Sequence, residues 1–287
     1  MSQRTSLVIS IVFSLLLSIS ASAKQNAQKV ITIGAGITEL VIALGSEKQI
    51  IAADSTSRHF AEQYGLPILG YQRNLNTENI LALQPTTIIG TDEMGPKVVL
   101  EQLKQSGINI IQLSNTQYNF SDLLDNTKLI GETLGKSIET EQLIKSMQTS
   151  YHKIQQLKLP SLNTLFLFFP SNNQIMAGGS KTVVDGMLQA LNLKNIAANK
   201  SGYYAYSIEH ILQSQPKVLL VSARELTQNL DKILQDNPFL QQLEATKKQC
   251  VFTIDGQALL GGFNLKSLHE SQHIAQLLAN KPECLTD

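Results

Sequence analysis

Short apolar runs alternate along the chain with segments whose apolar residues recur every three or four positions. Runs of the first kind are typical of buried strands, and the spacing of the second kind is typical of helices with one apolar face. In the first half, strand patterns fall at 30–33, 86–90 and 108–113, and helical patterns at 38–45, 96–107 and 123–134. This alternation predicts α/β architecture built on parallel sheets.

One long helical pattern interrupts the alternation near the middle of the chain. Leu143, Met147, Tyr151 and Ile154 recur at helical spacing until Pro160 stops the run. Beyond it the alternation resumes, with strand patterns at 163–169, 217–222 and 249–254 and helical patterns at 181–192 and 265–278. We therefore expect two α/β halves joined by a single long helix.

Two segments of the first half have counterparts in the second. Residues 76–90 align without gaps on residues 207–221, and residues 33–45 resemble residues 177–192 in the same order. Two similar halves predict two Rossmann-like lobes with central parallel-type sheets and a ligand cleft between them. The expected division is a signal peptide at 1–23, an N-terminal lobe at 24–137, an interdomain helix at 138–159 and a C-terminal lobe at 160–287.

The first 23 residues have the features of a secretory signal peptide. Arg4 supplies a positive charge, the run from Leu7 to Ile19 is apolar, and residues 21–23 form an A-x-A cleavage site. The run is too short and too often interrupted by serine for a membrane anchor, and no cysteine stands at the cleavage site for lipid attachment. We expect a mature protein of 264 residues, which is 287 less 23, in the periplasm.

The charge balance argues against a nucleic-acid partner. Without Arg4 the chain holds 22 basic and 23 acidic residues, a formal net charge of −1 with histidine neutral. No basic field for phosphates results from such a balance.

Both cysteines lie near the C-terminus. Cys250 and Cys284 are the only two in the chain, and an oxidising compartment allows them to form a disulfide that ties down the C-terminal tail. A metal or redox pair is the weaker alternative, because the two are far apart and lack CxxC spacing.

The loop before the helix at 76–83 carries the most informative polar residues. Pro67 and Gly70 predict irregular backbone that leads into Tyr71. A tyrosine phenolate is a known ligand of haem iron, but an ordinary pKa of about 10 means that a nearby cation must assist its ionisation. Arg73 is the candidate for that cation, or for pairing with a haem propionate. From the residues alone, an ordinary loop tyrosine with a half-buried ring and a surface arginine are the simpler interpretation.

A second tyrosine cluster occupies the matching place in the other half. Tyr203, Tyr204 and Tyr206 precede the helix that contains Glu209, as Tyr71 precedes its own helix. Aromatic faces suit a flat macrocycle, so we expect a tyrosine-rich wall opposite Tyr71.

Other chemistries have less support. His269 and His273 match the letters of the HExxH zinc motif, but little chain follows them, and an exposed helix face is the stronger interpretation. Gly34 and Gly36 lack the third glycine of a dinucleotide fingerprint. We expect them to allow a tight turn, with Thr38 as the helix N-cap and their amides facing the cleft.

The chain resembles the periplasmic haem-binding proteins of ABC importers, relatives of the cobalamin- and siderophore-binding proteins with a rigid interdomain helix. The resemblance covers nearly all of the mature chain and rests on ITIGAGITELVIALG, GYQRNLNTENILALQPTTII and AGGSKTVVDGMLQALNLKN. It implies that Tyr71 ligates ferric haem, that Arg73 matches the arginine of a GYxRxL pattern, and that Arg224 interacts with the haem-bound tyrosine. It also implies that Glu78 and Glu209, one on each lobe, meet arginines of the permease; a carboxylate there also suits the helix dipole.

We therefore expect a non-enzymatic, monomeric carrier without a catalytic cofactor, whose lobes move little. It is expected to bind haem in a pocket of Tyr71, Arg73, Tyr203, Tyr204 and Arg224, and to deliver it to the permease and ATPase complex of an inner-membrane ABC transporter. No histidine follows the strand at 163–169, where some relatives hold a second haem, so one haem is expected. A siderophore or a corrinoid on the same fold is the alternative, ahead of a zinc hydrolase.

Overall fold

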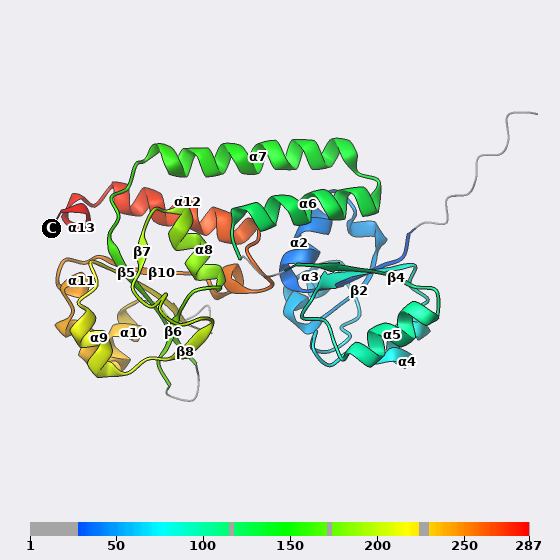
Figure 1. The fold of residues 1–287 in the computed structure, drawn as a ribbon, viewed down its shortest axis with the longest axis horizontal. Helices are drawn as coiled ribbons and strands as arrows, with labels where there is room; N and C mark the ends of the chain where they lie inside the picture. The colour runs from blue at the N-terminus through cyan, green and yellow to red at the C-terminus, as the bar shows by residue number, and fades with distance from the viewer. Residues whose placement is uncertain (1–27, 115–117, 171–173, 224–229, 287) are drawn as a thin grey trace, which may run out of the picture.

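The chain forms two α/β lobes that lie side by side, with one long helix spanning both of them (Figure 1). This computed structural model describes residues 28–114, 118–170, 174–223 and 230–286, so the expected signal peptide lies outside the described residues. The predicted α/β class and the long helix are confirmed: α7 occupies Ser137–Gln156. Within the described ranges, no helix has both the length and the apolar character that a bilayer crossing needs.

The first lobe is built on a parallel sheet of four strands in the order β2-β1-β3-β4. Side chains of β1 alternate between two apolar clusters, with Val30 on the face of α2 and α6 and Ile31 on the face of α4 and α5. Helices therefore cover both faces of the sheet, as parallel sheets require. The elements are β1 Val30–Ile33, α2 Ala35–Ala43, β2 Ile50–Ala53, α3 Arg58–Tyr64, α4 Thr77–Ala82, β3 Thr87–Thr91, α5 Lys97–Gln105, β4 Asn109–Leu113 and α6 Phe120–Leu134.

The second lobe has a mixed sheet in the order β10-β9-β5-β6-β8, with the short β7 also paired to β5. Strands β5, β7, β9 and β10 are parallel, whereas β6 pairs antiparallel with both β5 and β8, so the expected parallel-type sheet gains antiparallel pairing at one edge. The chain returns directly beside β5 without a crossover helix, which only antiparallel pairing allows. The elements are β5 Asn163–Phe169, β6 Met176–Gly178, α8 Val183–Ala190, β7 Lys194–Asn195, β8 Tyr203–Ala205, α9 Ile208–Ser214, β9 Val218–Ala223, α10 Leu230–Asp236, α11 Glu244–Lys247, β10 Val251–Thr253, α12 Leu265–Ala279 and α13 Pro282–Leu285.

The internal repeat has the same local structure in both lobes. Asn76 and Ser207 are the N-caps of α4 and α9, and each side chain accepts a hydrogen bond from the amide three residues on. Each helix is followed by a glutamine with positive φ, Gln84 after α4 and Gln215 after α9. A proline then leads into β3 or β9. The aligned segments thus form equivalent helix–strand units.

The two lobes are in direct contact through α2 and the turn before α12. A Cβ atom on Gly36 would lie 2.8 Å from the carbonyl oxygen of Gly261, so only glycine permits this approach. One helical turn later, a carboxylate oxygen of Glu39 accepts a hydrogen bond from the amide of Leu265, at 3.0 Å. Burial raises the pKa of Glu39, although hydrogen bonds from the amides of Lys266 and Leu265 oppose the shift.

The expected role of Thr38 as a helix N-cap is wrong. Helix α2 begins at Ala35, after Gly34 with φ of 111°. The hydroxyl of Thr38 instead lies inside the first turns, 2.8 Å from the hydroxyls of both Thr32 and Ser57. The N-terminus is satisfied by buried Asp54, whose carboxylate accepts the amide of Gly34 at 2.8 Å. That amide is therefore used within the lobe.

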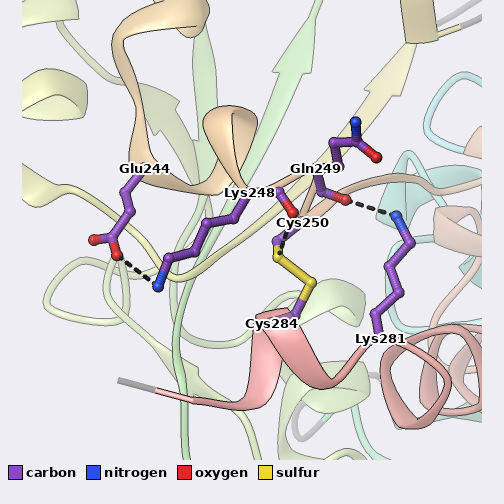
Figure 2. The surroundings of a disulfide bond; sticks show 6 residues. All are labelled: Glu244, Lys248, Gln249, Cys250, Lys281 and Cys284. Carbon is purple, nitrogen blue, oxygen red and sulfur yellow. Dashed lines mark hydrogen bonds and ion pairs between the residues drawn. A yellow bond between two sulfur atoms is a disulfide. The ribbon is translucent and has the colours of Figure 1, made fainter.

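A disulfide joins Cys250, just before β10, to Cys284 in α13 (Figure 2). Both cysteines are buried. Beside them, the Lys281 ammonium donates a hydrogen bond to the carbonyl of Gln249 at 2.7 Å. The C-terminal helix is thus held to the edge of the second sheet by a covalent bond and a charge-assisted hydrogen bond.

The interlobe contact predicts opposite behaviour for two substitutions of Glu39. Glu39→Ala leaves the partly buried amide of Leu265 without its acceptor and should lower the free energy of unfolding by about 1–3 kcal/mol. Glu39→Gln keeps an acceptor and removes the buried charge. Because burial raises the pKa of Glu39 in the folded state, the wild type loses stability from this group as the pH rises above the ordinary carboxyl range. Glu39→Gln should therefore gain stability relative to the wild type as the pH is raised. Urea unfolding at several pH values measures both effects, and equal stability of the two variants would contradict the assignment.

The disulfide predicts a loss of stability on its removal. Its cysteines are separated by 34 residues, and for a loop of that size Cys250→Ser with Cys284→Ser should lower the free energy of unfolding by about 2–4 kcal/mol. Thermal unfolding of the oxidised wild type, the reduced wild type and the double variant measures this. A double variant as stable as the oxidised protein would show that the bond does not stabilise the fold.

Candidate functional site

The site is formed where the parallel strands of each lobe end. In the first lobe, Ile68 makes a parallel bridge with Ala53 at the end of β2, which carries the following loop along the carboxyl edge of the sheet. Tyr71 lies on this loop and is 49% exposed. Carboxyl edges of open α/β sheets are the usual place for ligands, so the structure places the predicted tyrosine where a ligand can reach it.

Backbone hydrogen bonds fix the Tyr71 loop to the loop after β3. The amide of Gly95 donates to the carbonyl of Gln72 at 3.0 Å, and the amide of Leu75 donates to the carbonyl of Gly95 at 2.8 Å. The amide of Asn74 closes the turn by donating to the carbonyl of Tyr71 at 2.8 Å. Tyr71 therefore extends from a braced turn although its own side chain is exposed.

Arg73 is paired with a carboxylate that the sequence did not indicate as functional. A terminal guanidinium nitrogen of Arg73 lies 2.7 Å from one carboxylate oxygen of Glu93, and the side-chain amide of Gln72 donates to the other oxygen at 2.7 Å. Arg73 nevertheless keeps 60% of its side-chain exposure. Glu93 stands directly after Asp92 at the end of β3. This acidic pair at the end of a strand is the sequence signal that could have identified Glu93.

Tyr118, between β4 and α6, connects the charged edge of the first lobe with the second lobe. Its backbone carbonyl packs against Gly186 in α8, where a Cβ atom would clash with it. Burial, followed by the charges of Glu93 and Asp92, raises the pKa of Tyr118. Burial and the neighbouring Tyr118 likewise raise the pKa of Tyr203. Sequence reasoning missed Tyr118, since a lone tyrosine before a helix gives no functional signal.

The second lobe contributes a largely apolar cavity of about 390 Å³. It lies where β5, β6, β8 and β9 meet the turn after β10. Ser222 faces it with its side chain almost fully buried, and its hydroxyl has no hydrogen-bond partner among the described residues. The cavity is lined by Phe168, Pro170, Gln174, Met176, Tyr203, Ser222, Gly256, Leu259 and Leu260.

Tyr203 and Tyr204 face different surroundings. Tyr203 lines the cavity, whereas the hydroxyl of Tyr204 donates to the carbonyl of Ala197 at 2.8 Å within the second lobe. Adjacent residues of a strand point to opposite faces, so β8 brings only one of the two expected tyrosines to the cavity. Arg224, the other residue expected there, lies outside the described residues.

Glu78 and Glu209 occupy equivalent exposed positions in the first turns of α4 and α9. Hydrogen bonds from its own amide and from the hydroxyl of Ser207 lower the pKa of Glu209. Each lobe thus presents one carboxylate at the start of its repeated helix.

The histidines of the HExxH letters do not form a metal site. His269 and His273 are exposed on α12, and among the described residues no three side chains of the metal-binding types gather together. The exposed helix face expected from the sequence is what the structure shows.

The chain is similar to several known binding proteins. The periplasmic haem-binding protein HutB of Vibrio cholerae has a solved structure that is 34% identical in sequence, with a TM-score of 0.80 over 88% of this chain and 99% of that one. An uncharacterised ABC transporter substrate-binding lipoprotein of Bacillus subtilis, YvrC, is 22% identical over 81% of this chain and 74% of its own. The vitamin B12-binding protein of Vibrio parahaemolyticus is 22% identical over 71% and 74% of the two chains.

The sequence profile that describes periplasmic binding proteins matches residues 30–258, a range that includes both sheets and the long helix between them. The chain therefore belongs to the periplasmic binding protein family.

Proposed function

We propose that this protein binds haem in the periplasm and delivers it to an inner-membrane ABC transporter. The observation that carries the proposal is the exposed phenol of Tyr71 on a braced loop, two residues before Arg73 and at the carboxyl edge of the first sheet. A phenolate oxygen is an established protein ligand of haem iron. The proposed carrier makes and breaks no bond other than iron coordination.

The surroundings of Tyr71 distinguish it from the other tyrosines of the site. Tyr118 is partly buried beside Glu93 and Asp92, and burial and these charges raise its pKa, which disfavours the phenolate form. Tyr203 is nearly as exposed as Tyr71, at 41% against 49%, but it lines the apolar cavity. Tyr71 lies two residues before the cation of Arg73 and is therefore the proposed ligand.

The cavity of the second lobe suits the rest of a porphyrin. Phe168, Met176, Leu259 and Leu260 supply an apolar wall, and transfer of a flat hydrophobic macrocycle out of water onto such a wall is favourable. Arg73 at the opposite edge is able to pair with a propionate. A haem that bridges the two edges accounts for both the charged and the apolar parts of the site.

The relatives support haem and leave one alternative. HutB, the 34% identical structure, is a haem-binding protein by its name, whereas a 22% identical relative binds vitamin B12. A corrinoid is therefore the second candidate, and dependence of binding on Tyr71 distinguishes the two.

Tyr71→Phe should weaken binding of ferric haem by about tenfold or more, equivalent to at least about 1.4 kcal/mol, because it removes only the proposed iron-ligating oxygen. Absorption titration of the mature protein measures the affinity, and the wild type should show the spectrum of high-spin haem with an oxygen ligand, which the variant loses. Tyr64→Phe, on an exposed tyrosine of α3, is the matched control. An unchanged spectrum in Tyr71→Phe would exclude the assigned ligand, and saturable binding of cobalamin without haem binding would favour the alternative.

Glu78 and Glu209 are the proposed contacts with the permease. Substitution of both by alanine should leave haem affinity unchanged and should reduce stimulation of the transporter ATPase in proteoliposomes by about tenfold or more, since two exposed carboxylates that pair with arginines contribute to docking. Glu132→Ala, on an exposed carboxylate of α6, controls for loss of negative charge. Full stimulation by the double variant would rule out these contacts.

A further inference from the structure

Charged side chains lie on the loops beside Tyr71 at the edge of the first lobe. Arg73, Asp92 and Glu93, here called the first-lobe rim, bring one cation and two carboxylates to the loops beside Tyr71. An iron chelate that approaches Tyr71 meets this rim. The charge of the rim therefore affects which chelates bind.

Glu93 is the fixed member of the rim. Each of its carboxylate oxygens accepts a hydrogen bond at 2.7 Å, one from the guanidinium of Arg73 and the other from the side-chain amide of Gln72. Gln72 is itself only 6% exposed. Its own amide donates to the hydroxyl of Thr91 at the end of β3, at 3.3 Å. A ligand is thus unable to displace Glu93 easily, and it meets the carboxylate together with Arg73.

Arg73 keeps binding capacity in this arrangement. One terminal nitrogen contacts Glu93, the side chain remains 60% exposed, and a guanidinium has five N–H donors. One carboxylate of a ligand is able to pair with the remaining donors. Because Glu93 balances Arg73, a further carboxylate near the rim meets the remaining negative charge of Asp92.

We propose that Glu93 is a specificity-determining residue, which cancels the charge of Arg73 at the first-lobe rim and so selects iron porphyrins with few carboxylates over polyanionic iron chelates. This inference rests on the proposed haem-binding function and deepens it by naming the charge class of the ligand. Repulsion of the wrong ligand is a common source of specificity. It acts at a partly exposed site, so it is sensitive to salt.

Two ferric porphyrins with the same ring but different charge test the inference. Ferric protoporphyrin IX has two carboxylates, and ferric coproporphyrin III has four. Both are titrated into the mature wild type, Glu93→Gln and the control Glu132→Gln, at low and at high salt. The ratio of the two dissociation constants is the readout, because an altered position of Arg73 or a general loss of stability changes both affinities together.

The wild type should prefer the dicarboxylate, and Glu93→Gln should shrink that preference by roughly threefold or more at low salt, as expected for one charge within about 10 Å of the added carboxylates. The difference should fade at about 1 M salt, where the screening length is about 3 Å, and Glu132→Gln should behave as wild type. A preference that Glu93→Gln leaves unchanged, or that Glu132→Gln changes equally, overturns the inference while haem binding stands. Failure of the wild type to bind either porphyrin overturns the proposed function and this inference with it.

Discussion

The close contact between α2 and the turn before α12 sets the distance between the two lobes. Gly36 faces the carbonyl of Gly261 so closely that a Cβ atom has no room, and Glu39 binds the first amide of α12 from the other lobe. Helix α7 lies along both lobes (Figure 1), and one apolar core continues from the first sheet through Met147 and Ile154 of α7 into the second. Close-packed interiors resist deformation, and this continuous packing is the physical basis for the expectation that the lobes move little.

The lobes share a repeated unit but present different chemistry at their edges. The helix–strand units that begin at Asn76 and Ser207 have equivalent N-caps and a buried isoleucine at the same position, Ile80 or Ile211. In each unit a glutamine with positive φ follows the helix. In the first lobe the carboxyl edge holds Arg73 and its carboxylate partner. In the second, the antiparallel strands β6 and β8 add an apolar wall. A ligand with one polar edge and one apolar face fits such a pair of edges.

The tyrosines of the site lie in different surroundings. Tyr118 is partly buried where the lobes join, and burial and two neighbouring carboxylates raise its pKa. Tyr203 lines the apolar cavity of the second lobe, with 41% of its surface exposed. The exposed position of Tyr71 comes from a turn that three backbone hydrogen bonds brace, so backbone structure, and not side-chain packing, presents the proposed ligand.

The sequence by itself determined the α/β class, the long helix and the repeat. Apolar periodicity and proline positions depend only on neighbouring residues, so they can be interpreted without knowledge of tertiary contacts. Pro67 and Gly70 also indicated an irregular loop around Tyr71 and Arg73, but only the family resemblance gave these two residues a role. Only the tertiary structure paired Arg73 with Glu93 across 20 residues and brought Tyr118 against Gly186. It also made Gly34, whose amide donates to Asp54, the N-cap of α2 in place of the expected Thr38, and it turned Tyr204 away from the cavity that Tyr203 lines. Those features depend on which strand ends meet at one edge and on which face of a strand is buried, and pairing in space decides both.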